Sequence, residues 1–328
     1  MNSKSRVAER VRNLPFSGIR KFFDIVAQRK DVISLGVGEP DFDTPWTVRE
    51  AAVYSLERGA THYTSNRGDP GLRQAIARYV ARQFGEEYDW KTEILVTVGV
   101  SEAIDIALRT IINPGDEVIY HEPCFVSYRP SIILAGGVPV CVETRREDDF
   151  RLTRPMLGKA VTPKTRALML NFPCNPTGAV LARKDVEEIS NFCIQHDLLL
   201  LTDEIYAELT YDSQHISFVS IPGMKERTIF MHGMSKAWAM TGFRIGYACA
   251  PADISENMIV EARKRLMDVA CGSIRFINGD ALELLGSGGP YDLVFSSWVL
   301  GYIPLEPFFQ KAAGALRKGG TLAFIVHR

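Results

Sequence analysis

Several features that mark special classes of protein are scarce or missing in this sequence. No apolar run within its 328 residues is long enough to span a bilayer, and no charged-then-apolar leader opens the chain. The 38 Lys and Arg residues balance the 39 Asp and Glu residues, which leaves no basic surface for nucleic acid or for an anionic membrane. These absences favour a cytoplasmic protein that binds neither nucleic acid nor a membrane.

Cysteine and histidine are also sparse. The six cysteines are far apart and form no Cys-x-x-Cys pair, and the six histidines show no metal-ligand spacing among themselves or with the cysteines. We therefore expect reduced, mostly buried thiols and no structural metal. A hydrophobic content of 46% and a charged content of 23% are ordinary for a globular protein of one or two domains.

The sequence does contain an alternation of short apolar segments with amphipathic ones. Polar residues of helical period at 1–30 predict a mobile N-terminal arm. After them, strands are expected at 94–98, 117–120, 138–142, 166–171, 198–202, 228–231 and 243–250, and helices at 70–84, 101–112, 126–134 and 183–196. This pattern predicts an α/β fold with a mainly parallel sheet covered on both faces, in which ligands bind beyond the carboxyl ends of the strands.

One lysine stands directly after an apolar run, in Gly233-Met234-Ser235-Lys236-Ala237, and Arg244 follows eight positions later. Burial lowers the pKa of an ammonium group, and a lysine with a lowered pKa is a good amine nucleophile toward an aldehyde. Alternatively, Lys236 is a surface lysine after a strand, and Arg244 is a surface arginine on an edge strand.

Two segments earlier in the chain place a glycine or an aromatic residue after an expected strand. In Val98-Gly99-Val100-Ser101, free N–H groups at the start of a helix are suited to binding phosphate. Alternatively, Ser101 only caps the helix. In the segment 122–128, Phe125 is placed either to stack on a ligand ring or to fill the core.

Two later segments place polar side chains after strands. Asn175 opens an Asn-Pro-Thr-Gly turn, which directs its amide toward a ligand. Asp203 ends a run of leucines, and Tyr206 follows it. A carboxylate at such a buried place is costly without a cationic partner. The alternative for Asp203 is a helix N-cap.

In this order, the segments resemble those of class I/II aminotransferases that use pyridoxal phosphate (PLP), the fold-type-I enzymes, over residues 15–251. The resemblance implies that Lys236 holds PLP as a Schiff base and moves a proton between substrate and cofactor. It implies that Asp203 keeps the ring nitrogen protonated. It also implies that Asn175 and Tyr206 bond the phenolic oxygen and that Phe125 stacks on the ring.

The same resemblance assigns the remaining site residues. The cofactor-binding set would also include Gly99, Val100, Ser101, Ser235 and Arg244, the arginine clamping the phosphate. Gly36 would lie beside the substrate carboxylate, and Tyr63 would reach the phosphate of the neighbouring subunit in a homodimer.

Residues 253–328 instead resemble the middle of a class I methyltransferase that uses S-adenosylmethionine (SAM). The matching segments are 253–258, 278–281, 291–297 and 316–322. The resemblance implies that Asp253 binds the ribose hydroxyls and that Asp280 lies near the adenine. Alternatively, Asp253 caps the next helix with Glu256, and Asp280 is a loop carboxylate. The glycine-rich loop expected before Asp253 is missing, which argues against SAM as a cofactor.

The sequence thus predicts an arm at 1–44, a PLP-binding large domain at 45–252 and a Rossmann-like α/β segment at 253–328. The last would replace the small C-terminal domain of the family and act as a surrogate cap on the large domain. We predict a homodimeric PLP-dependent aminotransferase acting on amino acids and 2-oxo acids. Turnover should be more impaired than cofactor binding, because the arginine for the substrate carboxylate has no counterpart. The alternatives are an inactive fold hybrid and a SAM-dependent methyltransferase.

Overall fold

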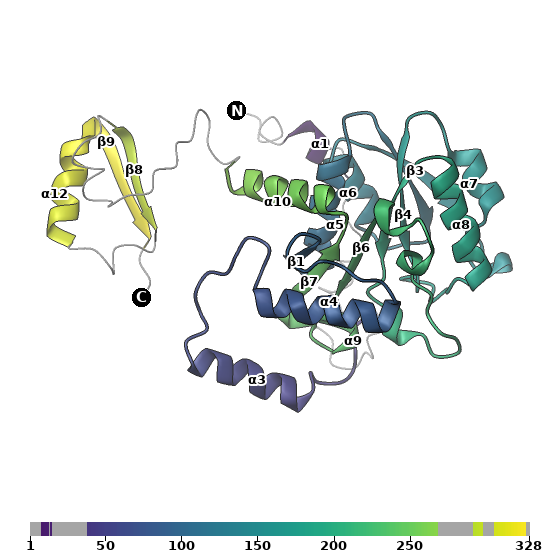
Figure 1. Ribbon diagram of the computed structural model, residues 1–328. Coiled ribbons are helices and arrows are strands. Elements are labelled where there is room, and N and C mark those ends of the chain that lie inside the picture. The colour runs from purple at the N-terminus through teal and green to yellow at the C-terminus, as the bar shows by residue number, and fades with distance from the viewer. Residues whose placement is uncertain (1–7, 13, 15–37, 268–290, 298–304, 326–328) are drawn as a thin grey trace, which may run out of the picture. The chain divides into compact units, whose positions relative to one another are not determined.

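The computed structural model describes residues 8–12, 14, 38–267, 291–297 and 305–325 (Figure 1). The chain divides into two compact units, Met1–Leu266 and Met267–Arg328. Gly36 and Asp280 lie outside the described residues. Within the described ranges, no helix is both long and apolar enough to cross a membrane.

The first unit is built on a seven-stranded sheet with the strand order β1-β7-β6-β5-β4-β2-β3. The strands are β1 (Ile94–Val98), β2 (Glu117–Glu122), β3 (Val138–Glu143), β4 (Thr165–Asn171), β5 (Leu199–Asp203), β6 (Thr228–Gly233) and β7 (Ile245–Cys249). Only β7 runs antiparallel to its neighbours, β1 and β6. The expected α/β fold with a mainly parallel sheet is therefore confirmed.

Helices cover both faces of this sheet (Figure 1). The helices of the unit are α1 (Glu9–Arg12), α3 (Trp46–Glu57), α4 (Pro70–Phe84), α5 (Gly99–Ile111), α6 (Tyr128–Leu134), α7 (Arg154–Ala160), α8 (Arg183–Gln195), α9 (Met234–Ala237) and α10 (Ala252–Met267). Short 3-10 helices are η2 (Arg146–Asp148), η3 (Ala207–Leu209), η4 (Phe218–Ser220), η5 (Lys225–Arg227) and η6 (Thr241–Phe243). Residues of α5, α6 and α10 pack on one face, and those of α4, α7 and α8 pack on the other.

The alternation of side chains along the buried strands explains this two-sided core. Leu200 of β5 packs under α8, whereas Leu201 packs under α5. Phe230 and Met231 of β6 divide in the same way between α4 and α5. Successive side chains of a strand point to opposite faces, so a continuous apolar run supplies two cores at once.

The expected strand at 243–250 begins later than predicted. Thr241–Phe243 forms a 3-10 turn and Arg244 has a left-handed backbone with φ of 56°, so β7 starts at Ile245. Since β7 lies between β1 and β6, the interpretation of Arg244 as a residue on an edge strand is wrong. Val98 pairs with Ile245, which brings the residue after β1, Gly99, beside the residue before β7, Arg244.

Helix α10 joins the core of the first unit although its sequence resembles a methyltransferase. Met258 is fully buried and Ile259 is 3% exposed, and both belong to the cluster formed with α5 and α6. The Arg67 guanidinium donates to Ser255 Oγ at 2.9 Å and pairs with the Glu256 carboxylate. Asp253 lies in the first turn of α10, and Glu256 binds Arg67. The first turns of the methyltransferase-like segment thus complete the large-domain core.

The second unit contains a β-α-β arrangement. Strand β8 (Tyr291–Ser297) pairs in parallel with β9 (Leu316–Ile325), and α12 (Leu305–Ala315) lies between them in the chain. Parallel neighbours joined through a helix are the repeating element of Rossmann-like folds. Two of the methyltransferase-like segments, 291–297 and 316–322, therefore lie in paired strands.

Burial of α10 predicts an unequal response to shortening its side chains. Met258→Ala should lower the free energy of unfolding by about 3 kcal/mol, because it leaves a cavity in the core. Val260→Ala on the same helix, where the side chain is 39% exposed, should cost less than about 1 kcal/mol. Urea denaturation of the full chain measures both, and equal effects would contradict the packing of α10.

Candidate active site

A cavity of about 660 Å³ is lined by residues from the carboxyl edge of the sheet. Nine of the predicted site residues line it: Val100, Ser101, Phe125, Asn175, Asp203, Tyr206, Ser235, Lys236 and Arg244. They follow β1, β2, β4, β5 and β6, or precede the antiparallel strand β7, so all are brought to one edge. Gly99 does not line the cavity but lies close to Arg244, whereas Tyr63 is fully exposed and does not line the cavity.

The start of α5 and the side chain of Arg244 form a positively polarised corner. No side chain caps α5, so the interpretation of Ser101 as an ordinary N-cap is wrong. Gly99 has φ of 70°, and a Cβ atom there would lie 2.4 Å from Arg244 Nη2. A Cβ atom on Gly246 would lie 2.4 Å from the carbonyl carbon of Gly99. The two glycines therefore let the guanidinium approach uncapped N–H groups, an arrangement suited to phosphate.

A buried carboxylate occupies another wall of the cavity. Asp203, at the end of β5, is 5% exposed. Its Oδ2 accepts a hydrogen bond from Tyr128 Oη at 2.7 Å, and its Oδ1 accepts one from the Ile205 N–H at 3.2 Å. Burial raises the pKa of Asp203 to about 6, against the opposing effect of these hydrogen bonds. The carboxylate caps no helix and, among the described residues, forms no ion pair, so a cationic ligand group would compensate its burial.

Two asparagines organise the loops after β4 and β5. Asn175 Nδ2 donates to Tyr206 Oη at 3.3 Å, which brings an amide and a phenol to one place in the cavity. Asn171 Oδ1 accepts from the Asn175 N–H at 2.9 Å, and Asn171 Nδ2 donates to the Asp203 carbonyl oxygen at 2.8 Å. Burial and the charge of Asp203 raise the pKa of Tyr206, so its phenol remains a hydrogen-bond donor.

Lys236 is half-buried on the short helix α9, which directly follows β6. Its Nζ donates to the Gly38 carbonyl oxygen and lies 5.8 Å from the centre of the Tyr206 ring. Burial lowers the pKa of Lys236, as does the charge of Arg244, while Glu39 opposes the change. This direction favours the free amine, which is the nucleophilic form.

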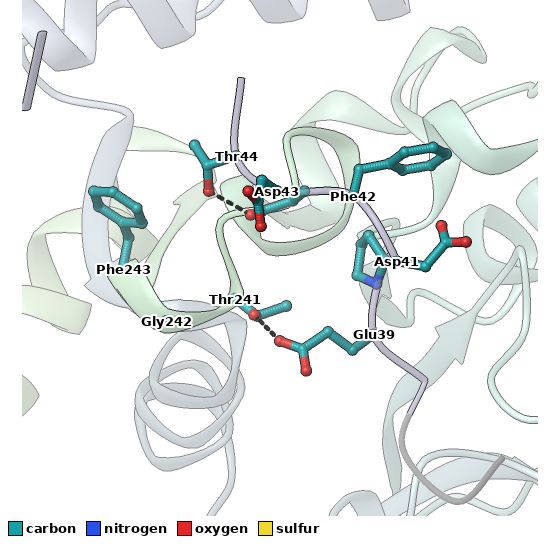
Figure 2. A pocket seen from close by; sticks show the side chains of 10 residues that line it. Glu39, Asp41, Phe42, Asp43, Thr44, Thr241, Gly242 and Phe243 are labelled. Carbon is teal, nitrogen blue, oxygen red and sulfur yellow. Dashed lines mark hydrogen bonds between the residues drawn. The ribbon is translucent and has the colours of Figure 1, made fainter. Parts of the chain in front are cut away.

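A second pocket, of about 560 Å³, shares lining residues with this cavity, and Figure 2 shows its lining side chains. Thr241 Oγ1 donates to the Glu39 carboxylate, and Thr44 Oγ1 donates to the Ala239 carbonyl oxygen at 2.6 Å. These bonds hold the segment 39–44 against the loop that follows Lys236. Glu39 and Thr241 line both pockets, so the Thr241–Glu39 hydrogen bond lies between them.

The sequence interpretation assigned no role to Tyr128, Asn171 or Glu39. A signal for Tyr128 was present, because it follows Phe125 by three residues at the start of a helix. Its ring indeed meets the Phe125 ring edge to face at 5.6 Å. Asn171 had the appearance of a strand terminus, and its contacts depend on where the Asp203 loop lies.

The donors of the cavity fit PLP. The corner of α5 and Arg244 suits the phosphate, and the Asp203 carboxylate suits a protonated ring nitrogen. Asn175 and Tyr206 can donate to a phenolic oxygen, and Lys236 offers an amine for an aldehyde. Each of these chemical groups is present in the one cofactor.

Comparison with known proteins gives two matching families. The family "Aminotransferase class I and II" matches residues 30–273, and the family "Methyltransferase domain" matches residues 238–320. Both resemblances seen in the sequence are therefore confirmed. The two matched ranges share residues 238–273, which contain all of α10.

Individual relatives agree with the first family. The chain is 51% identical to an aspartate aminotransferase of Pyrococcus abyssi over 74% of its own length and 63% of that protein. It is 45% identical to aromatic-amino-acid aminotransferase 2 of Thermococcus litoralis, over 85% and 71% of the two lengths. The structure of an aromatic aminotransferase from Pyrococcus horikoshii matches with a TM-score of 0.70 at 48% identity, over 75% of this chain and 66% of that one. The chain thus spans less than two thirds of some of these relatives.

The pKa of Asp203 is higher in the folded state than in the unfolded state, so the folded protein binds the proton of the Asp203 carboxyl group more tightly. The protonated Asp203 carboxyl group therefore adds to the free energy of unfolding below the ordinary pKa of about 4, and this contribution is lost as the pH rises through about 6. In PLP-free protein, Asp203→Asn should raise the free energy of unfolding at pH 7 by up to about 3 kcal/mol, and by less at pH 4.

Urea denaturation at the two pH values measures this effect. Asp212→Asn, in an exposed loop, is the matched control and should change little at either pH. A less stable Asp203→Asn protein at pH 7 would contradict the buried, unpaired carboxylate.

Proposed function

Because the chain belongs to the family of class I and II aminotransferases, we propose that it is a PLP-dependent aminotransferase acting on amino acids and 2-oxo acids. The observation that carries the proposal is the cavity in which Lys236, Asp203 and Arg244 converge from three different segments. The named activities of the relatives, on aspartate and on aromatic amino acids, support the reaction class.

PLP, when bound, supplies an electron sink for the carbanion at the substrate α-carbon. We propose that Lys236 Nζ attaches the cofactor and afterwards accepts and returns the α-proton. Asp203 would hold the proton on the ring nitrogen, where its carboxylate gains the cationic partner that the protein itself does not provide. Because the Asp203 carboxylate is buried away from water, its attraction to the protonated ring nitrogen would be stronger than at the surface.

The other lining residues would fix the cofactor in place. Arg244, with the N–H groups of Gly99, Val100 and Ser101 and the Ser235 hydroxyl, would bind the phosphate. Asn175 and Tyr206 would donate to the phenolic oxygen, and Phe125 would cover one face of the ring. Gly36 stays a proposed neighbour of the substrate carboxylate.

We propose PLP rather than SAM as the cofactor. The sequence has no glycine between Gly246 and Gly272, so no glycine-rich loop precedes Asp253. Asp253 also lies within α10, and Met258 and Ile259 of this helix pack in the large-domain core. The methyltransferase-like match thus begins in sequence that the aminotransferase fold uses for packing.

We further propose that two copies of the chain associate. Helix α3 buries none of its residues and exposes Trp46 by 66%, Val53 by 55% and Leu56 by 63%. Such a set of large apolar side chains is typical of an interface. Tyr63 follows this helix fully exposed, available to the phosphate of a neighbouring copy.

The visible absorption of protein incubated with PLP tests the cofactor assignment. The wild-type chain should show a visible band, and borohydride should fix PLP to the peptide that contains Lys236. Lys236→Ala should lose both signals. Lys159→Ala, an exposed lysine on α7, should retain both. A wild-type chain without a band would overturn the proposal, and amino-donor turnover by the loaded protein would extend it to catalysis.

Sedimentation velocity tests the association. Leu56→Glu should weaken self-association at least ten-fold, because it places a charge in an apolar interface. The variant should still bind PLP through Lys236, which shows that the large domain is folded. A wild-type chain that sediments as a monomer at all concentrations would contradict the proposed homodimer.

A further inference from the structure

Tyr128 is a fully buried side chain that reaches the wall of the cavity. It is the first residue of α6, and its Oη donates to Asp203 Oδ2 at 2.7 Å. Its ring meets the Phe125 ring at an interplanar angle of 77° with the centroids 5.6 Å apart. One side chain thus contacts both groups proposed to hold the cofactor ring.

We propose that Tyr128 is a positioning residue of the cofactor site, whose hydroxyl keeps Asp203 as a carboxylate aimed into the cavity and whose ring supports Phe125. The inference rests on the proposed function and deepens it. Tyr128 itself touches no reacting atom, and it acts through these two neighbours.

The geometry of Asp203 leaves its orientation dependent on Tyr128. The Ile205 N–H, only two residues away, holds Oδ1, and Tyr128 holds Oδ2 from a different element. Two donors on the two oxygens fix the plane of the carboxylate. An O–H donor to an ionised oxygen also favours the charged form. Burial and the charge of Asp203 raise the pKa of Tyr128 far above its ordinary value, so the phenol keeps its proton.

Other charged groups near Asp203 do not replace this hydrogen bond. His232 of β6 lowers the pKa of Asp203, and Glu204, the next residue in the chain, raises it. His232 Nε2 contacts Glu208 at 3.1 Å, and the Glu204 carboxylate is held by His215 at 2.6 Å. Lys236 and Arg244 line the same cavity but form no ion pair with Asp203 in the described part of the chain. Removal of the Tyr128 hydroxyl should therefore leave Asp203 Oδ2 without this hydrogen bond and without a replacement from these groups.

A matched pair of substitutions tests the proposal. Tyr128→Phe removes the hydroxyl that binds Asp203. Tyr120→Phe removes the hydroxyl of another buried tyrosine, which donates to Glu122 Oε1 at 2.7 Å and does not line the cavity. The dissociation constant of PLP, measured between pH 5.5 and 8.5, should rise about ten-fold or more for Tyr128→Phe at pH 7. Tyr120→Phe should match the wild type. Equal effects of the two substitutions would overturn the proposal.

Two further readouts separate positioning from a general loss of structure. The ¹⁵N resonance of labelled PLP should shift toward the unprotonated ring in Tyr128→Phe at neutral pH. In an Asp203→Asn background, the same substitution should weaken PLP binding no further, because no carboxylate remains to be held. An unshifted resonance, or full additivity of the two substitutions, would refute the role assigned to Tyr128.

A measurement on PLP-free protein keeps this inference distinct from the proposed function. The titration of the Asp203 carboxyl, followed by ¹³C NMR and assigned with Asp203→Asn, should move up by about one pH unit in Tyr128→Phe. If the wild type fails to bind PLP, the proposed function fails, and this titration still decides whether Tyr128 holds the carboxylate charged. An unchanged midpoint would refute the inference.

Discussion

A carboxylate buried at the end of β5, without a cationic partner among the described residues, is the constraint on which the site depends. Tyr128 reaches Asp203 from α6, Ile205 from the following turn, and Asn171 from the end of β4. Tyr128 and the Ile205 N–H bind the carboxylate itself, whereas Asn171 binds the backbone carbonyl of Asp203, so three segments converge on one residue. The remaining cost of burial is evident in the raised pKa of Asp203. The protein thus maintains a local instability at the place where a bound cation would relieve it.

Much of the large-domain fold could be predicted from hydropathy alone. The strand at Ile94–Val98 and the helix at Pro70–Phe84 have the expected bounds, because apolar runs and the Asp69 cap with Pro70 and Gly85 mark their ends. The direction of β7 could not be predicted in the same way. A buried strand has the same apolar pattern whether it runs parallel or antiparallel, and only pairing with β1 and β6 decides between them.

The site was predictable where one segment carries its own chemistry, as around Lys236 and Asn175. It was not predictable where a contact joins distant segments. Tyr128 lies 75 residues from Asp203, and Glu39 lies 202 residues from Thr241. Nothing within either segment indicates such a pairing. The same limit applies to α10, whose methyltransferase-like sequence carried no sign that Met258 would pack against the large-domain helices.

The position of β1 has a consequence for how the chain is made. Among the described strands, β1 lies at the sheet edge and pairs with β7 alone, so Ile94 cannot pair until Cys249 has left the ribosome. Pairing across such a separation delays closure of the sheet until most of the large domain has been synthesised. Sequence after β7 emerges later than every strand of this sheet. Evolution or an engineer can therefore exchange that sequence without altering the order in which the sheet assembles, provided that its first helix still covers α5 and α6.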